Sequence, residues 1–315
     1  MASSLLRRRS DLHFGHEGRR GRSRTVQLPT VLVEVPKSAE LVGPYHQPLW
    51  SARGRFSSGA EVYVLPPWEF FVDLDYQLTV PRHGTATHLF TQELELGLPY
   101  RFQVAYENNT EVAGRRAQAT VQTIEGRWAP ANWDKIPLNP TLFAEYKFGI
   151  GQQRESSDAD ETELPDEAEE PDQSHGSSRI PNSFEVRLLL GQQFGEHIQW
   201  ALNIFHEQEV GGDRETETGF SQALSYSLSE ETLRAGLEMQ FIRRTERDSR
   251  SKPAYEFDVG PSIAWKPSKR TRLDVAALFG TTDDSPALNV FAVFSIDFGS
   301  AAEREAEAPV STRNR

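Results

Sequence analysis

Three consecutive segments near the C-terminal end alternate apolar and polar residues, and this alternation restricts the fold more than any other feature. Between Lys252 and Phe298, apolar side chains recur at every second position, as in Tyr255, Phe257 and Val259. A period of two predicts β-strands, because successive side chains of a strand point to opposite faces of a sheet. Each segment has roughly the nine to eleven residues with which a tilted strand crosses a bilayer. The pattern therefore indicates strands long enough to span a membrane.

The same alternation is already present earlier in the chain. It begins at Phe70 and gives a total of twelve predicted strands. An even number of strands leaves both ends of a barrel on one side, as in bacterial outer-membrane barrels. Connections after even-numbered strands are mostly short, and those after odd-numbered strands are mostly longer and polar. Two connections break this rule, namely the short turn near Gly84 and the long link 127–139. We therefore predict an all-β fold, a transmembrane antiparallel β-barrel of about twelve strands.

A soluble β-sandwich is the alternative, since its strands also alternate. The polar positions of the predicted strands are too charged for a dry core, because burying an unpaired charge costs several kcal/mol. A hydrated lumen would accommodate them, and aromatic residues near strand ends, such as Tyr106 and Trp265, suit membrane interfaces. We expect the following charged residues to line the lumen: Asp73, Asp75, Glu93, Glu95, Arg101, Arg187, Arg234, Glu238, Asp258, Arg272, Asp274 and Asp297.

Acidic residues of the first two predicted strands come close together if those strands form a hairpin. Asp73 then lies opposite Glu93 on the inner face, with Asp75 and Glu95 nearby. Like charges at this spacing repel each other and need cations, bases or water. One interpretation is the cation-attracting wall of a conduit, because charged rings set the selectivity of pores. The other is a packed lumen with neutralised acids, for which the candidate bases are Arg101, Lys266 and Arg272.

The chain divides into one predicted barrel and several irregular segments. We expect a disordered basic extension at 1–45, a periplasmic lead-in at 46–69 that packs at the rim, and the barrel at 70–299. The barrel region contains an acidic flexible loop at 150–181, and a charged tail follows at 300–315. Low hydrophobicity, high charge and missing periodicity mark such segments as unable to form a core.

Composition argues against most kinds of chemistry. The 315 residues include no cysteine, so neither a disulfide nor a zinc–thiolate site is possible. No glycine-rich phosphate loop lies between a strand and a helix, so nucleotide chemistry is unsupported. The eight histidines show no spacing typical of a catalytic site. We expect no enzyme activity, no cofactor, no metal and no nucleic-acid partner.

The N-terminal residues fit an exported protein poorly. Arg7, Arg8 and Arg9 could form the basic part of a signal peptide, but the stretch after them is polar instead of apolar. A misassigned start, a missing signal and an error in the export hypothesis all stay open. The run Val31–Val35 is similar to a docking box for a periplasmic partner, or is simply a strand-prone piece of linker.

Two stretches carry a family resemblance, namely Leu89–Gln103 and the region from Gly260 to Phe298 with its Asp283–Pro286 turn. They resemble uncharacterised outer-membrane β-barrel proteins of Gram-negative bacteria, over roughly residues 38–299. The resemblance implies a location in the cell outer membrane, with its lipid and the barrel-assembly machinery as partners. We expect a passive channel for small solutes or cations, or a structural protein. A receptor or binding protein is the alternative, and a membrane-embedded lipid hydrolase is a third class.

Overall fold

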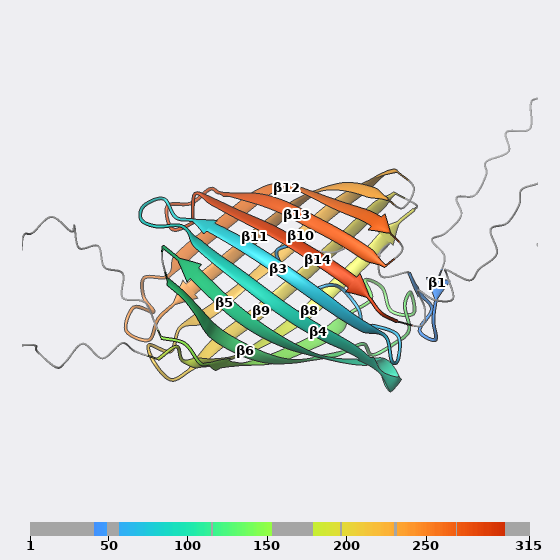
Figure 1. The fold of residues 1–315 in the computed structure, drawn as a ribbon, viewed down its shortest axis with the longest axis horizontal. Helices are drawn as coiled ribbons and strands as arrows, with labels where there is room; N and C mark the ends of the chain where they lie inside the picture. The colour runs from blue at the N-terminus through green and yellow to red at the C-terminus, as the bar shows by residue number, and fades with distance from the viewer. Residues whose placement is uncertain are drawn as a thin grey trace, which may run out of the picture. The chain divides into compact units, whose positions relative to one another are not determined.

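Pairing of each strand with its neighbour in the sequence, and of the last with the first, produces a closed barrel of twelve antiparallel strands (Figure 1). The computed structural model describes residues 41–48, 57–114, 116–152, 179–195, 197–229, 232–268 and 270–299. All of them belong to one compact unit, Pro36–Arg315. The predicted all-β barrel and its strand number are confirmed.

The barrel strands are nine to fifteen residues long. No helix within the described ranges is both long and apolar enough to cross a membrane. A short 3-10 helix, η2 (Pro99–Arg101), and a two-stranded sheet of β1 (Leu41–Val42) and β2 (Gln47–Pro48) lie outside the wall. The wall consists of β3 (Phe70–Val80), β4 (Thr87–Leu98), β5 (Phe102–Ala113), β6 (Arg116–Trp128), β7 (Thr141–Gly149), β8 (Asn182–Phe194), β9 (Ile198–Val210), β10 (Thr216–Ser229), β11 (Leu233–Thr245), β12 (Ala254–Ser268), β13 (Thr271–Gly280) and β14 (Leu288–Asp297).

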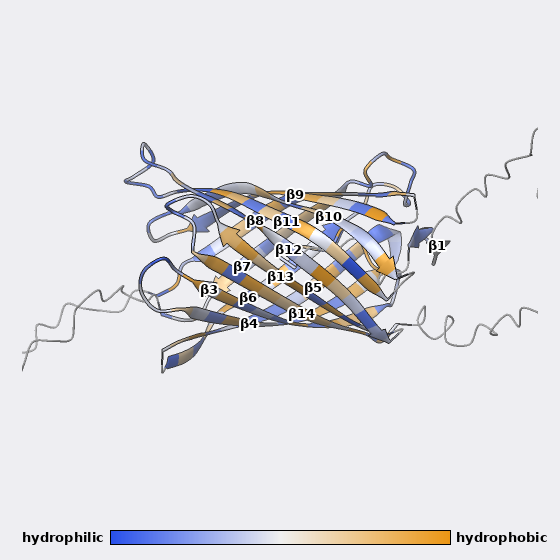
Figure 2. Cartoon of the chain, turned by 90° about the horizontal axis from the view of Figure 1, so that it is seen from above, coloured by the Kyte–Doolittle hydropathy of each residue, from blue (hydrophilic) through white to orange (hydrophobic). Residues whose placement is uncertain are grey.

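The two faces of the wall differ sharply in polarity, as the alternating colours along the strands show (Figure 2). Outward side chains are apolar and exposed, including Ile124 at 57%, Leu224 at 51% and Phe279 at 53%. Inward side chains are polar or charged and buried, as Glu95 and Arg272 are. An apolar surface of this extent is unfavourable in water and favourable against lipid tails, because its burial removes it from water. The outer face is thus suited to a bilayer.

Two positions of β14 that interrupt the alternation have a clear place in the structure. Phe291 and Val293 point inward and are buried, at 9% and 4% exposure. Phe291 packs against Ala276 and Leu278 on the neighbouring strand β13. The inner wall therefore carries an apolar strip among its polar side chains.

The barrel has two different ends. Phe298 donates its backbone N–H to the carbonyl oxygen of Phe70 at 2.9 Å, so the first strand starts where the last one finishes. We call this the terminal end; it also carries the connections after β4, β6, β8, β10 and β12. The opposite end, which we call the loop end, carries the connections after the other strands, including 153–178. That tract, the extension before 41 and the tail after 299 lie outside the described residues.

A charge on the lipid face tests the orientation of the wall. Replacing Leu224 by arginine should lower the free energy of unfolding in lipid vesicles by about 2–4 kcal/mol, because the guanidinium would enter the hydrocarbon layer. Leu224→Phe keeps the site apolar and serves as the control. Equilibrium unfolding in guanidinium chloride measures both variants. Equal stability of Leu224→Arg and the parent protein would contradict this orientation.

Candidate functional site

Residues 57–66 run inside the barrel near its terminal end, and we call this segment the plug. Its backbone is held by side chains that the wall directs inward. The backbone N–H groups of Ala60 and Leu65 donate hydrogen bonds to the side-chain amide oxygens of Asn203 at 2.9 Å and Gln103 at 2.8 Å. The backbone N–H group of Ser57 donates to the carboxylate of Glu238 at 3.1 Å. These acceptors come from β9, β5 and β11, so the plug is fixed from three sides of the lumen.

Glu238 is the most heavily used of these acceptors. Its carboxylate receives the backbone N–H groups of Ser57 and Ser58, the latter at 3.3 Å, and the Ser58 hydroxyl at 3.0 Å. The side chain is 1% exposed. Several donors to one buried carboxylate offset the cost of removing its charge from water. Glu238 thus acts as the main anchor of the plug's first residues.

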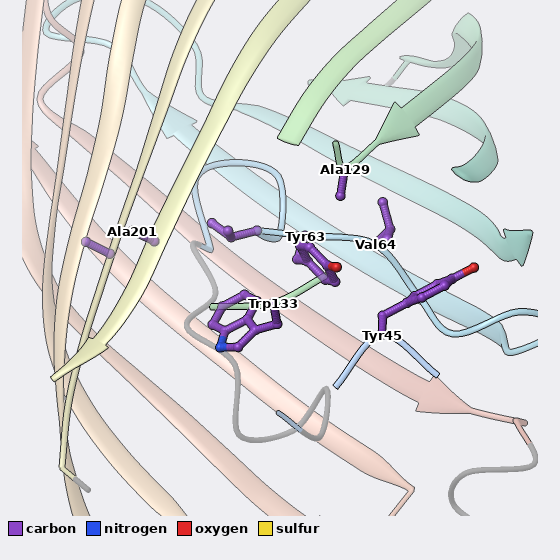
Figure 3. Packing of buried hydrophobic residues seen from close by; sticks show 8 residues of the cluster. Tyr45, Tyr63, Val64, Ala129, Trp133 and Ala201 are labelled. Atoms are coloured by element: carbon purple, nitrogen blue, oxygen red, sulfur yellow. The ribbon is translucent and has the colours of Figure 1, made fainter. Parts of the chain in front are cut away.

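An apolar cluster holds the rest of the plug. Figure 3 shows Tyr63, Val64 and Trp133 next to one another inside the terminal end, with Tyr45 close by. The rings of Tyr63 and Trp133 meet edge to face, with their centroids 5.3 Å apart. The Tyr63 hydroxyl donates to the carbonyl oxygen of Ala131 at 2.8 Å, so this buried phenol is satisfied. Such aromatic pairs contribute roughly 0.5–1.5 kcal/mol beyond their buried area.

Small residues of the wall make room for the plug. A Cβ at Gly191 would lie 2.7 Å from Val62 Cγ1, and a Cβ at Gly97 would collide with the carbonyl oxygen of Pro66. Ala201 and Ala223 complete the wall side of the apolar cluster. These residues sit at inward positions where larger side chains would occupy the space of the plug. The wall is therefore shaped for this segment.

The connection 129–140 explains one break in the loop-length rule. It folds inward and covers the plug, with Gly191 donating its N–H to Leu138 and accepting from the Asn139 side chain. Asp134, Leu138 and Asn139 all have positive φ, which produces the tight path. This link is long because it closes the terminal end together with the plug.

Three carboxylates lie around one guanidinium on the inner wall between β3 and β6, and a fourth, that of Asp73, lies next to two of them. Arg127 lies 3.1 Å from Glu95, 3.6 Å from Glu93 and 3.1 Å from Glu125. Oxygens of Asp73, Glu93 and Glu95 all lie within 4.8 Å of one another. All five side chains are buried. Carboxylate oxygens are ligands for hard cations, but Arg127 already contributes positive charge at this cluster.

The expected pairing of Asp73 with Glu93 is confirmed, since the two are opposite in the β3–β4 register. Arg127 is a neutralising base that the sequence did not identify, and of the expected bases Arg272 pairs with Asp274 at 2.7 Å. Arg101 belongs to η2, outside the wall, and donates to the carbonyl oxygen of Ala129 at 2.9 Å. The prediction that Arg101 lies on a strand was wrong. Its backbone is left-handed, with φ of 65°, so the strand begins at the next residue.

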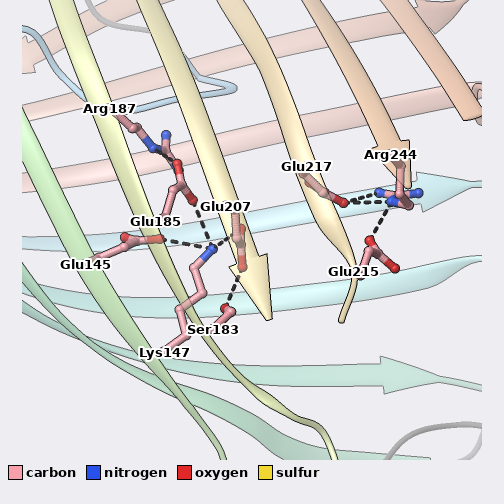
Figure 4. A network of polar contacts seen from close by, with 9 residues as sticks. All are labelled: Glu145, Lys147, Ser183, Glu185, Arg187, Glu207, Glu215, Glu217 and Arg244. Carbon is pink, nitrogen blue, oxygen red and sulfur yellow. Dashed lines mark hydrogen bonds and ion pairs between the residues drawn. The ribbon is translucent and has the colours of Figure 1, made fainter. Parts of the chain in front are cut away.

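A second charged network crosses β7, β8 and β9 (Figure 4). Lys147 Nζ lies 3.0 Å from Glu145, 3.1 Å from Glu185 and 2.6 Å from Glu207. Arg187 also pairs with Glu185 and stacks 5.0 Å from the centroid of the Phe143 ring. Two basic side chains thus form ion pairs with three carboxylates. Both networks leave acidic groups in excess on this side of the lumen.

A third network lies toward the loop end, where Arg244 binds Glu215, Glu217 and Glu256 at 2.6–2.7 Å. Figure 4 shows its Glu215, Glu217 and Arg244 side chains. Glu215 belongs to the connection between β9 and β10. The pKa of the Glu215 carboxyl is raised to about 7, because the effect of burial exceeds the opposing effect of Arg244. Its negative charge is therefore present above that pH and lost below it, so the ion pair weakens as the pH falls.

A cavity of about 550 Å³ lies beyond the plug, between the first residues of the plug and the loop end. We call it the vestibule. Ser58 of the plug forms part of its lining, together with residues of β3, β11, β12, β14 and the connection between β13 and β14. The vestibule is much larger than two small cavities of about 10 Å³ each, one lined by Val62 and Trp133 and the other by Ser57 and Glu238.

Most predicted lumen residues are buried on the inner wall. Side chains with at most 9% exposure are Asp73, Glu93, Glu95, Arg234, Glu238, Asp258, Arg272, Asp274 and Asp297. Asp75 and Arg187 are half-buried. The prediction missed Arg127, which was assigned to the link 127–139 although it continues the inward parity of β6. That parity was the available signal.

One comparison with a solved structure supports the fold. A crystal structure of an outer-membrane channel from Pseudomonas putida F1 has a TM-score of 0.52 at 10% identity, covering 76% of this chain and 99% of that one. The KdgM porin in complex with disordered oligogalacturonate and the NanC porin follow at 8% identity, with TM-scores of 0.43 and 0.45. Each covers 73% of this chain, and 98% and 99% of those chains. No protein-family model and no curated sequence matches the chain. The chain thus has the fold of an outer-membrane β-barrel.

Proposed function

We propose that the protein is a passive channel of the outer membrane for small solutes or ions, held closed by its own plug. The observation that carries this proposal is the polarity of the wall, apolar outside and charged inside. A charged interior is stable when water or paired ions solvate it, as in a conduit. Outer-membrane lipid is then the environment of the outer face, and insertion would depend on the barrel-assembly machinery. The charged lumen residues predicted from the sequence, apart from Arg101, would line the pathway.

The distribution of charge supports a preference for cations. The Arg127 and Lys147 networks both contain more carboxylates than basic groups. Charged walls of one sign raise the local concentration of oppositely charged ions and set selectivity. An acidic wall would therefore admit small cations more readily than anions.

Conduction would require the plug to move. The wall holds it with a few hydrogen bonds, each contributing a net of roughly 0.5–1.5 kcal/mol, and with one apolar cluster. Contacts of this strength permit reversible displacement without unfolding of the barrel. The plug is connected to the N-terminal part of the chain, from which displacement could be driven.

A receptor that binds a ligand at the loop end is the second candidate. The observation that favours it is the closed floor of the vestibule, where Ser58 and Glu238 meet. The acidic tract and the run Val31–Val35, which the receptor hypothesis also uses, lie outside the described residues. The hydrolase hypothesis has less support. His206 Nδ1 pairs with the Thr218 hydroxyl at 2.9 Å, on the opposite face of β9 from Glu207, which accepts the Ser183 hydroxyl at 2.6 Å.

A disulfide between the plug and the wall tests the closed state directly. The parent chain has no cysteine. In Val62→Cys/Gly191→Cys the two Cβ atoms would lie about 3.1 Å apart, so a shift of a few tenths of an ångström reaches disulfide geometry. Single-channel recording should show few openings when the protein is oxidised and frequent openings after reduction with dithiothreitol.

The single variants Val62→Cys and Gly191→Cys are the controls, and neither should respond to dithiothreitol. Equal conductance of the oxidised and reduced double variant would contradict a plug that closes the pathway. Formation of the disulfide is verified separately by its effect on migration in a denaturing gel.

Removal of two acids tests the role of the Arg127 cluster. Asp73→Asn/Glu93→Gln leaves Arg127 with fewer negative neighbours, so the wall becomes less attractive to cations. The K⁺/Cl⁻ permeability ratio from reversal potentials should fall by roughly two-fold or more. Asp248→Asn, in the exposed connection between β11 and β12, is the control and should leave the ratio unchanged. An unchanged ratio in the double variant would rule out a conduit lined by this cluster.

A further inference from the structure

We propose that the vestibule is a binding site for a small neutral polyol, such as a mono- or disaccharide. This inference rests on the proposed channel function and specifies the class of solute that enters it. Three features of the cavity carry it: its size, the contacts that already engage most of its charged groups, and the combination of amide groups with an apolar surface.

The size of the vestibule suits a small solute. Its volume of about 550 Å³ lies within the range of roughly 300–1,000 Å³ that is typical of small-molecule sites. Its walls come from β3 on one side and β11 on the other, and β14 lies next to β3. Ser58 of the plug closes its inner side. A solute that enters from the loop end would therefore stop against the plug.

Four of the charged residues that line the vestibule, Arg82, Arg244, Glu256 and Asp284, already have partners. Arg82 donates to the carbonyl oxygens of Gly280, Thr282 and Ser285 at 2.8–3.1 Å, which fixes the connection between β13 and β14. Arg244 is bound by Glu217 and Glu256 at 2.6 Å. A charged solute would have to compete with these pairs. A charged solute would therefore gain less from these bound groups than from free charges.

Neutral hydrogen-bonding groups remain available on the walls. The side-chain oxygen of Asn289 has no hydrogen-bond partner, although the residue is only 6% exposed and lines the cavity. Its amide nitrogen donates to Asp258 at 2.9 Å, which fixes the orientation of the oxygen. A buried acceptor without a donor is unfavourable, so a ligand hydroxyl there would be stabilising. Gln77 and Gln240 add amide groups on opposite walls.

An apolar surface lies among these amides. Phe291 and Ile242 both line the vestibule, and Phe291 is held in place by Ala276 and Leu278. A polyol ring presents C–H groups on its faces and hydroxyl groups around its edge. The faces match an aromatic side chain, while the hydroxyls match amide donors and acceptors. This combination distinguishes a sugar-like solute from a purely apolar or a charged one.

Equilibrium binding of maltose to the full-length protein in detergent tests the inference, with isothermal titration calorimetry as the measurement. We expect saturable binding of maltose, and weaker binding of the charged analogues gluconate and glucosamine. Phe291→Ala should weaken maltose binding by about ten-fold, because it removes the aromatic surface. Phe279→Ala, on the lipid side of β13 and 53% exposed, is the matched control and should not change the affinity.

Several outcomes would overturn the inference. Absence of saturable maltose binding, equal binding of the parent protein and Phe291→Ala, or tighter binding of either charged analogue would each do so. Binding needs no conduction, so its failure would leave the channel proposal intact. Conversely, a barrel that binds maltose but never conducts would refute the channel while keeping the site.

Discussion

Closure of the wall is the constraint on which the rest of the structure depends. A lipid bilayer offers no hydrogen bonds, so every backbone group of a spanning segment needs a partner within the protein. The pairing of β14 with β3 removes the last free edge of the sheet. Once the sheet is closed, the period of two in each strand assigns one set of side chains to lipid and the other to the lumen. The polarity of the two faces follows from that assignment.

The plug is a consequence of the polar inner face. Glu238, Gln103 and Asn203 point into a confined space and need donors, and the backbone of 57–66 supplies them. Small wall residues such as Gly191 and Ala201 leave the space that this segment fills. The terminal end is thereby closed, while the loop end retains an open cavity. The channel that we propose would need this asymmetry in order to stay closed until the plug moves.

Strand periodicity predicted the architecture because it is a local property of the sequence. The parity of β13 and β14, for example, identifies Asp274 and Asp297 as inward residues without any knowledge of their neighbours. Three features depend on distant contacts and escaped prediction. Arg127 meets Glu93 and Glu95 across the intervening strand β5, the inward Phe291 packs on β13, and the plug reaches wall residues far along the chain. Period alone carries no information on such pairs.

The most direct test of the central claim is the accessibility of spin labels along β13 in lipid bilayers. Single cysteines at 272 to 279 can be labelled selectively, because the parent chain contains none. Collision rates with oxygen, which concentrates in lipid, should peak at Leu273, Val275, Ala277 and Phe279. Rates with a water-soluble nickel complex should be low at those positions. A profile without a period of two, or one with aqueous access at the outward positions, would contradict a wall that faces lipid outside and a polar lumen inside.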